Sequence, residues 1–169
     1  LKSCTSIPLV MNNCHVLISN LAFNISDAPF ADKFRQFEID WELILPEVID
    51  IIRTHPNSGV VDVAAQCLRN CSFNQPNQSI ALKHGGVDAI LSAFDKFPES
   101  QMLAEQGTAV IHNLLSYSSM QILGPEKGRA CVRAVLRSLG PSSSPTLRAN
   151  AFGAVANLSF DSDFSREEI

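Results

Sequence analysis

The chain lacks most of the features that mark catalytic, metal-binding and membrane-spanning proteins. None of its five cysteines has the C-x₂-C spacing of a zinc site, and it contains no glycine-rich phosphate-binding loop. No apolar run approaches the roughly 18 to 20 residues that cross a bilayer. His15, His84 and His112 have no nucleophile or acidic partner at the spacing of a catalytic motif. We therefore predict no enzymatic activity, no metal site, no cofactor and no membrane span.

A basic charge balance is also missing. The 169 residues include 13 basic and 17 acidic side chains, a net charge of −4, which disfavours a general nucleic-acid-binding function. An odd number of cysteines, most of them in apolar helical patterns, indicates reduced core thiols and a cytoplasmic or nuclear location. Cys67 and Cys71, one helical turn apart, are interpreted in this way and not as a reactive or metal-binding pair. Apolar residues are abundant instead, at 46% against 18% charged, so we expect one folded domain over residues 1–169.

Four segments of the chain resemble one another around a shared asparagine. These anchor asparagines, separated by 50, 43 and 44 residues, are Asn20, Asn70, Asn113 and Asn157. Apolar or small residues recur at positions −10, −6, −2 and +1 from each anchor. In the third segment they are Leu103, Gly107, Ile111 and Leu114. These offsets follow one face of an α-helix, and the small residue at −6 permits close approach of a neighbouring helix. Units of this length cannot bury that face alone, so we expect them to stack.

A second amphipathic segment lies between successive anchors. We predict helices over residues 41–54, 86–97 and 126–139, and shorter helices over 29–38 and 76–84. Predicted first helical positions are Pro76, Pro125 and Pro145, and predicted N-caps are Ser58, Ser100 and Ser144. Gly140-Pro141 is expected to end the helix before it. Since no sustained alternating run is present, we predict an all-α fold.

The third segment carries the motifs of a known repeat family most completely. A short helix over 76–84 is followed by Gly85-Gly86-Val87-Asp88-Ala89-Ile90-Leu91, and then by a helix from Gly107 to Asn113-Leu114. In this order of elements, residues 7–160 resemble the armadillo family. The resemblance implies a right-handed α-solenoid of three to four repeats, with units at about 1–24 (partial), 25–74, 75–117 and 118–161. Such a short stack exposes two apolar ends, which predicts further repeats in a longer protein, terminal caps or self-association.

In armadillo proteins the third helices line a concave groove, where the anchor asparagine bonds the backbone of an extended peptide. The resemblance therefore implies groove contacts by the four anchors, with neighbours one turn away at Gln66, Asn24, Asn74, Tyr117 and Asp161. A primary amide suits this role because it both donates and accepts hydrogen bonds. The alternative is that the asparagines cap loops or bond within the repeat. Importin-α-like members also carry a tryptophan four residues before the anchor, and this chain does not. Its residues there are Val16, Gln66, Ala109 and Gly153, which argues against nuclear-import signals as ligands.

A basic stripe is the second candidate site. Arg129, Arg133 and Arg137 share one helix face because they are four residues apart, and they could bind an acidic peptide, phosphates or a membrane surface. The alternative is an ordinary solvated face.

The leading hypothesis is a non-catalytic scaffold that binds an extended or helical segment of a partner protein along the groove. Two alternatives stay open: a structural spacer or oligomerisation module of a larger protein, and phosphate or acidic-surface binding through the arginine stripe.

Overall fold

The computed structural model describes residues 40–73, 75–115 and 123–159, and within these ranges it contains seven α-helices and no strand. The helices are α3 (Trp41–Thr54), α4 (Ser58–Cys71), α5 (Gln75–Lys83), α6 (Gly86–Lys96), α7 (Gln101–Leu114), α9 (Pro125–Arg137) and α10 (Pro145–Ser159). The prediction of an all-α fold is confirmed. The predicted helix over 29–38 lies outside the described residues.

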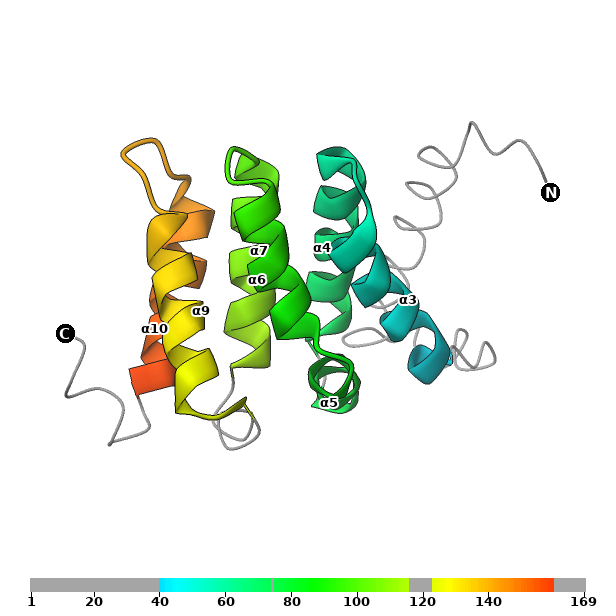
Figure 1. Ribbon diagram of the computed structural model, residues 1–169. Coiled ribbons are helices and arrows are strands. Elements are labelled where there is room, and N and C mark those ends of the chain that lie inside the picture. The colour runs from blue at the N-terminus through cyan, green and yellow to red at the C-terminus, as the bar shows by residue number, and fades with distance from the viewer. Residues whose placement is uncertain (1–39, 74, 116–122, 160–169) are drawn as a thin grey trace, which may run out of the picture.

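The helices form two adjoining layers (Figure 1). Helix α7 contacts both α4 and α10, so these three anchor helices make one layer. Helix α6 contacts both α3 and α9, and these three helices make the second layer. Each helix of the second layer also packs against the anchor helix that follows it in the chain: α3 against α4, α6 against α7, and α9 against α10. The short helix α5 lies below the two layers in this view, against α3 and α6. Each helix pair therefore meets the next pair through both layers.

Side-chain caps fix where the anchor helices begin. Ser100 and Ser144 cap α7 and α10 as predicted, because their hydroxyls accept hydrogen bonds from Leu103 N and Leu147 N. The predicted cap Ser58 is wrong. Asn57 caps α4 instead, its carboxamide oxygen accepting from Val60 N, and Ser58 is the first helical residue. Asparagine is at least as good a cap as serine, so the one-residue difference has no energetic cost.

Proline and glycine positions agree with most of the predicted boundaries. Pro125 and Pro145 are first helical residues, whereas Pro76 is the second residue of α5. Gly140 is not needed to end α9, which stops at Arg137, two residues short of the predicted end. Gly85 has a φ of 76°, the left-handed conformation that glycine tolerates, and it joins α5 to α6. The Gly-Gly pair is thus a helix joint, as expected.

The core follows the predicted apolar columns. Fully or nearly fully buried members are Val60, Leu103 and Leu147 at −10, Leu68 and Ile111 at −2, and Cys71, Leu114 and Leu158 at +1. The small residue at −6 has the predicted effect in α7, since a Cβ on Gly107 would lie 2.6 Å from Cε1 of Phe94. Glycine here lets α6 and α7 approach closely.

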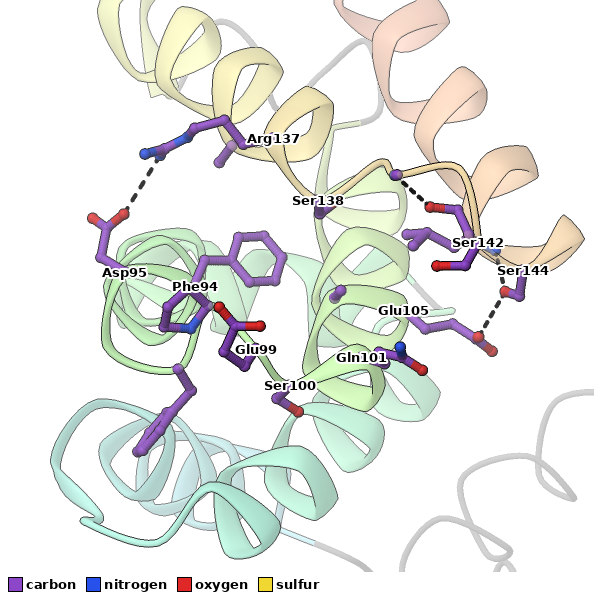
Figure 2. Close-up of a pocket in the computed structure, with 17 residues that line it drawn as sticks. Phe94, Asp95, Glu99, Ser100, Gln101, Glu105, Arg137, Ser138, Ser142 and Ser144 are labelled. Carbon is purple, nitrogen blue, oxygen red and sulfur yellow. Dashed lines mark hydrogen bonds and ion pairs between the residues drawn. The ribbon is translucent and has the colours of Figure 1, made fainter.

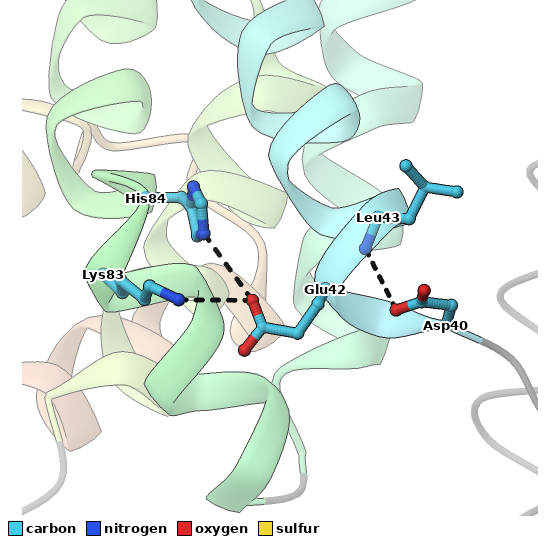
Figure 3. Close-up of polar contacts among 5 residues, drawn as sticks. All are labelled: Asp40, Glu42, Leu43, Lys83 and His84. Carbon is cyan, nitrogen blue, oxygen red and sulfur yellow. Dashed lines mark hydrogen bonds and ion pairs between the residues drawn. The ribbon is translucent and has the colours of Figure 1, made fainter.

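A polar contact joins α3 to the end of α5 (Figure 3). Glu42 of α3 lies 3.4 Å from Lys83 Nζ and 3.8 Å from His84 Nε2 at the end of α5. Both side chains of the lysine pair are more than half exposed, so the pair orients α5 without contributing much to stability.

Candidate partner-binding face

The described anchor asparagines occupy equivalent places near the carboxyl ends of the anchor helices. Asn70, Asn113 and Asn157 are each half-buried. Gln66 is also half-buried and lies one turn before Asn70 on the same side of α4. We call these four residues the amide column. The other predicted groove residues, namely Asn20, Asn24, Asn74, Tyr117 and Asp161, lie outside the described residues.

Two of the asparagines bond from one repeat to the preceding one. Asn113 Nδ2 donates to Arg69 O at 3.1 Å and to Ser72 Oγ at 3.2 Å, both at the end of α4. Asn157 Nδ2 donates to His112 O at 3.1 Å, at the end of α7. The last carbonyls of a helix have no partner inside that helix. Each asparagine therefore caps the preceding anchor helix. This structural role joins two repeats, whereas the alternative considered from the sequence placed such bonds within one repeat.

The side-chain amides of the column differ in how many N–H groups and oxygens remain to bind a ligand. Among the described residues, the two N–H groups of Asn113 both have acceptors and its carbonyl oxygen has no donor, while one N–H and the oxygen of Asn157 have no partner. The side chains of Asn70 and Gln66 make no hydrogen bond within the described part of the chain. Hydrogen-bonding capacity is consequently greatest on α4.

The side chains one residue before the anchors also contact the following repeat. Arg69 Nη1 donates to Gln106 Oε1 of α7 at 3.0 Å, and Gln106 is almost fully buried. The ring of His112 lies over Gly153, where a Cβ would come within 2.6 Å of Nε2. Sequence analysis missed both contacts. A usable signal was present, because position −1 holds a long polar or aromatic residue, and the following repeat offers an amide (Gln106) or a small residue (Gly153) for it to contact.

A second set of cross-repeat bonds joins the opposite ends of the same helices. Ser100 Oγ donates to Asp62 Oδ1 at 2.7 Å, and Ser144 Oγ donates to Glu105 Oε2 at 2.8 Å. The acids stand at the same offset, eight residues before their anchors. Adjacent anchor helices are therefore clamped at both ends, which holds the amide column in fixed positions.

The basic stripe lies on α9, and Cys131 and Val135 of the same helix are buried. Arg129 is half-buried, whereas Arg133 and Arg137 are exposed. Arg137 Nη2 lies 3.4 Å from Asp95 Oδ1 of α6. Close by, Lys127 Nζ lies 2.8 Å from Asp88 Oδ2 of the same helix. Acidic residues of α6 thus offset part of the positive charge of α9.

The described cysteines are free thiols inside the core. The Sγ atoms of Cys67 and Cys71 are 3.9 Å apart. A hydrogen bond with Cys67, together with burial, raises the pKa of Cys71 far above the usual range of a thiol. Burial, assisted by the Asp88 carboxylate, raises the pKa of Cys131 to about 12. Both thiols stay protonated near neutral pH, and protonated thiols are poor nucleophiles.

Among the residues that the structure describes, no three His, Cys, Asp or Glu side chains gather in a way that could hold a metal ion. None of the described helices is both long and apolar enough to cross a membrane. The chain matches no protein-family model, and comparison with curated proteins and with solved structures gives no significant match.

Proposed function

We propose that this chain is a non-catalytic interaction scaffold with an armadillo-like, right-handed solenoid arrangement. It binds an extended or helical segment of a partner protein across the side of α4, α7 and α10 that carries the amide column. The observation that supports this most directly is the Gln66–Asn70 pair. These two half-buried amides have no hydrogen bond in the described fold, and they lie one turn apart on a helix fixed by its neighbours.

The chemistry of the column fits a peptide backbone. Each peptide unit presents one donor and one acceptor, and a carboxamide can satisfy both at once. Because Asn70 and Gln66 keep donors and acceptors, they are the main contacts. Asn157 contributes one N–H and an oxygen, and Asn113 contributes an oxygen alone. Pre-positioned groups lose little conformational entropy on binding, which favours recognition by this face.

The arginine stripe is a weaker candidate for the main function. Its Arg137 is paired with Asp95, and the neighbouring Lys127 is paired with Asp88, so an anionic ligand would have to compete with carboxylates of α6. Arg133→Glu combined with Arg137→Glu should therefore leave partner binding intact.

Peptide selection on the wild-type chain tests the proposal. Peptides recovered from a random display library are synthesised, and their dissociation constants are measured by calorimetry against the wild type and the Gln66→Ala/Asn70→Ala variant. Loss of two amide contacts should weaken binding at least about fivefold, since each hydrogen bond contributes about 0.5–1.5 kcal/mol and about 1.4 kcal/mol corresponds to tenfold. Gln75→Ala, at an exposed amide on α5, is the matched control and should bind as the wild type does.

Circular dichroism and urea unfolding of each variant separate binding from folding. Peptides that bind the double variant as tightly as the wild type would contradict the proposal and move the site elsewhere. A library that yields no specific peptide would favour the structural-spacer alternative.

A further inference from the structure

A pocket of about 490 Å³ opens between two turns of the described chain (Figure 2). One turn, residues 97–100, joins α6 to α7, and the other, residues 138–144, joins α9 to α10. Phe94, Phe97 and Leu147 contribute to its apolar lining, and five serines contribute to its polar lining. We call this the turn pocket. It lies at the amino ends of α7 and α10, opposite the amide column, so it is a separate site.

Carboxylates outnumber cations in the turn pocket. Its charged lining residues are Asp95, Glu99, Glu105 and Arg137, a net charge of −2. Arg137 is occupied by Asp95 at one side of the pocket, and Glu105 accepts the Ser144 hydroxyl at the other. Glu99 lies between them with no ion pair to another described residue. This balance favours a cationic ligand and opposes an anionic one.

The preceding repeat junction shows how a cation fits such a place. Lys96, the last residue of α6, donates Nζ to His55 O at 2.9 Å and to Thr54 O at 3.5 Å, at the carboxyl end of α3. Its ammonium group also lies 5.2 Å from the centre of the Phe97 ring. Free carbonyl oxygens and the negative end of the helix dipole both attract a cation there.

The next junction has no equivalent of the Lys96 contact among the described residues. Arg137 is the last residue of α9, as Lys96 is of α6, but it turns to the Asp95 side chain. Within the described residues, no basic side chain of the following repeat reaches the backbone oxygens at the end of α6. The loop is also longer here, and a Cβ on Gly140 would meet nothing within 4 Å. Space and acceptors are therefore both open.

We propose that the turn pocket binds the side chain of a lysine from a partner polypeptide. The alkyl stem packs on Phe94, Phe97 and Leu147, and the ammonium group lies between Glu99 and Glu105. A cation would then occupy this repeat junction as Lys96 occupies the preceding one, held by carboxylates here and by backbone oxygens there. This site does not depend on the amide column.

An NMR titration tests the inference with two capped pentapeptides, one with a central lysine between alanines and one with acetyl-lysine in its place. The lysine peptide should shift the amide signals of residues 97–100 and 138–144 saturably. Acetylation, which removes the charge, should raise the dissociation constant at least about tenfold. Glu99→Gln/Glu105→Gln should have a similar effect, while glutamine at 105 can still accept the Ser144 hydroxyl. Glu47→Gln/Glu126→Gln, at exposed sites outside the pocket, is the charge-matched control.

The acetyl-lysine arm uses the unaltered protein, so misfolding of a variant cannot obscure the result. Equal affinity for the two peptides would overturn the proposal. So would unchanged affinity in the Glu99/Glu105 variant, or signal changes confined to α4 near the amide column. Loss of the 97–100 and 138–144 shifts in that variant alone, with the control variant unaffected, would support it.

Discussion

Helices α7 and α10 carry the same anchor pattern in successive repeats, yet residues at equivalent positions of the two helices differ greatly in burial. Five residues before the anchor, Thr108 of α7 is 0% exposed, whereas Phe152 of α10 is 71% exposed. Two residues before it, Ile111 is fully buried and Val155 only half-buried. Helix α7 lies between α4 and α10, while α10 has a described anchor helix on one side only (Figure 1). The burial of a position in this array is thus decided by the neighbouring repeat as much as by its own residue.

The largest expected contrast is between two truncations at position −2. Ile111→Ala should lower the free energy of unfolding by about 3–4 kcal/mol, because it leaves a cavity in a closely packed site. Val155→Ala should cost only about 1 kcal/mol, since it removes fewer atoms from a half-exposed site. Urea unfolding of both variants measures the difference. Similar losses would mean that something covers α10 in solution.

A second contrast concerns two glycines that lie under rings. Gly107→Ala forces a methyl group to within 2.6 Å of Phe94 and 3.1 Å of Ile90, so it should cost about 1–3 kcal/mol through overpacking. In Gly153→Ala the three atoms nearest to the new methyl group all belong to the His112 ring, which is partly exposed and can rotate away, so the cost should be less than about 1 kcal/mol. Thermal unfolding gives the order of the two variants. The reverse order would show that the His112 ring is held rigidly and that the α7–α10 junction is the tighter one.

The amide column supplies a third and smaller contrast. Asn113→Ala removes two cross-repeat hydrogen bonds and should lower stability by about 1–2 kcal/mol. Asn70→Ala should lower it by less than about 0.5 kcal/mol, because no described bond is lost. Asn113→Asp is a useful control, since a carboxylate of the same shape cannot donate to Arg69 O. If Asn70→Ala proved as costly as Asn113→Ala, Asn70 would serve the fold and not a ligand.

Much of this fold could be predicted from the sequence. The −10, −6, −2 and +1 columns located the core, and the amphipathic segment 41–54 is helix α3 with the predicted ends. Errors arose where two neighbouring residues could do the same job. Asn57 and Ser58 can both cap a helix, and local propensity does not choose between them.

The candidate site was less predictable, for a physical reason. Position in the repeat predicts that Asn113 and Asn157 are equivalent, but Asn113 makes a second hydrogen bond because Ser72 follows α4, whereas Leu115 stands at the same place after α7. The serine-to-acid clamps join residues 38 or 39 positions apart, which a search for local motifs does not detect. The turn pocket results from a difference in length between two loops, and its volume can be read only from the packed structure.

The smallest expected effect on stability lies at Phe152, where the contrast between α7 and α10 is clearest. Phe152→Ser should change the free energy of unfolding by less than about 0.5 kcal/mol, because the ring is mostly in solvent in the folded chain. An exposed aromatic ring beside Val155 still favours contact with another apolar surface. The variant should therefore sediment with less concentration-dependent association than the wild type if two copies meet through this end of the stack. A loss of stability above about 1 kcal/mol in dilute solution would show that the ring is buried within a single chain, and α10 would then be as enclosed as α7.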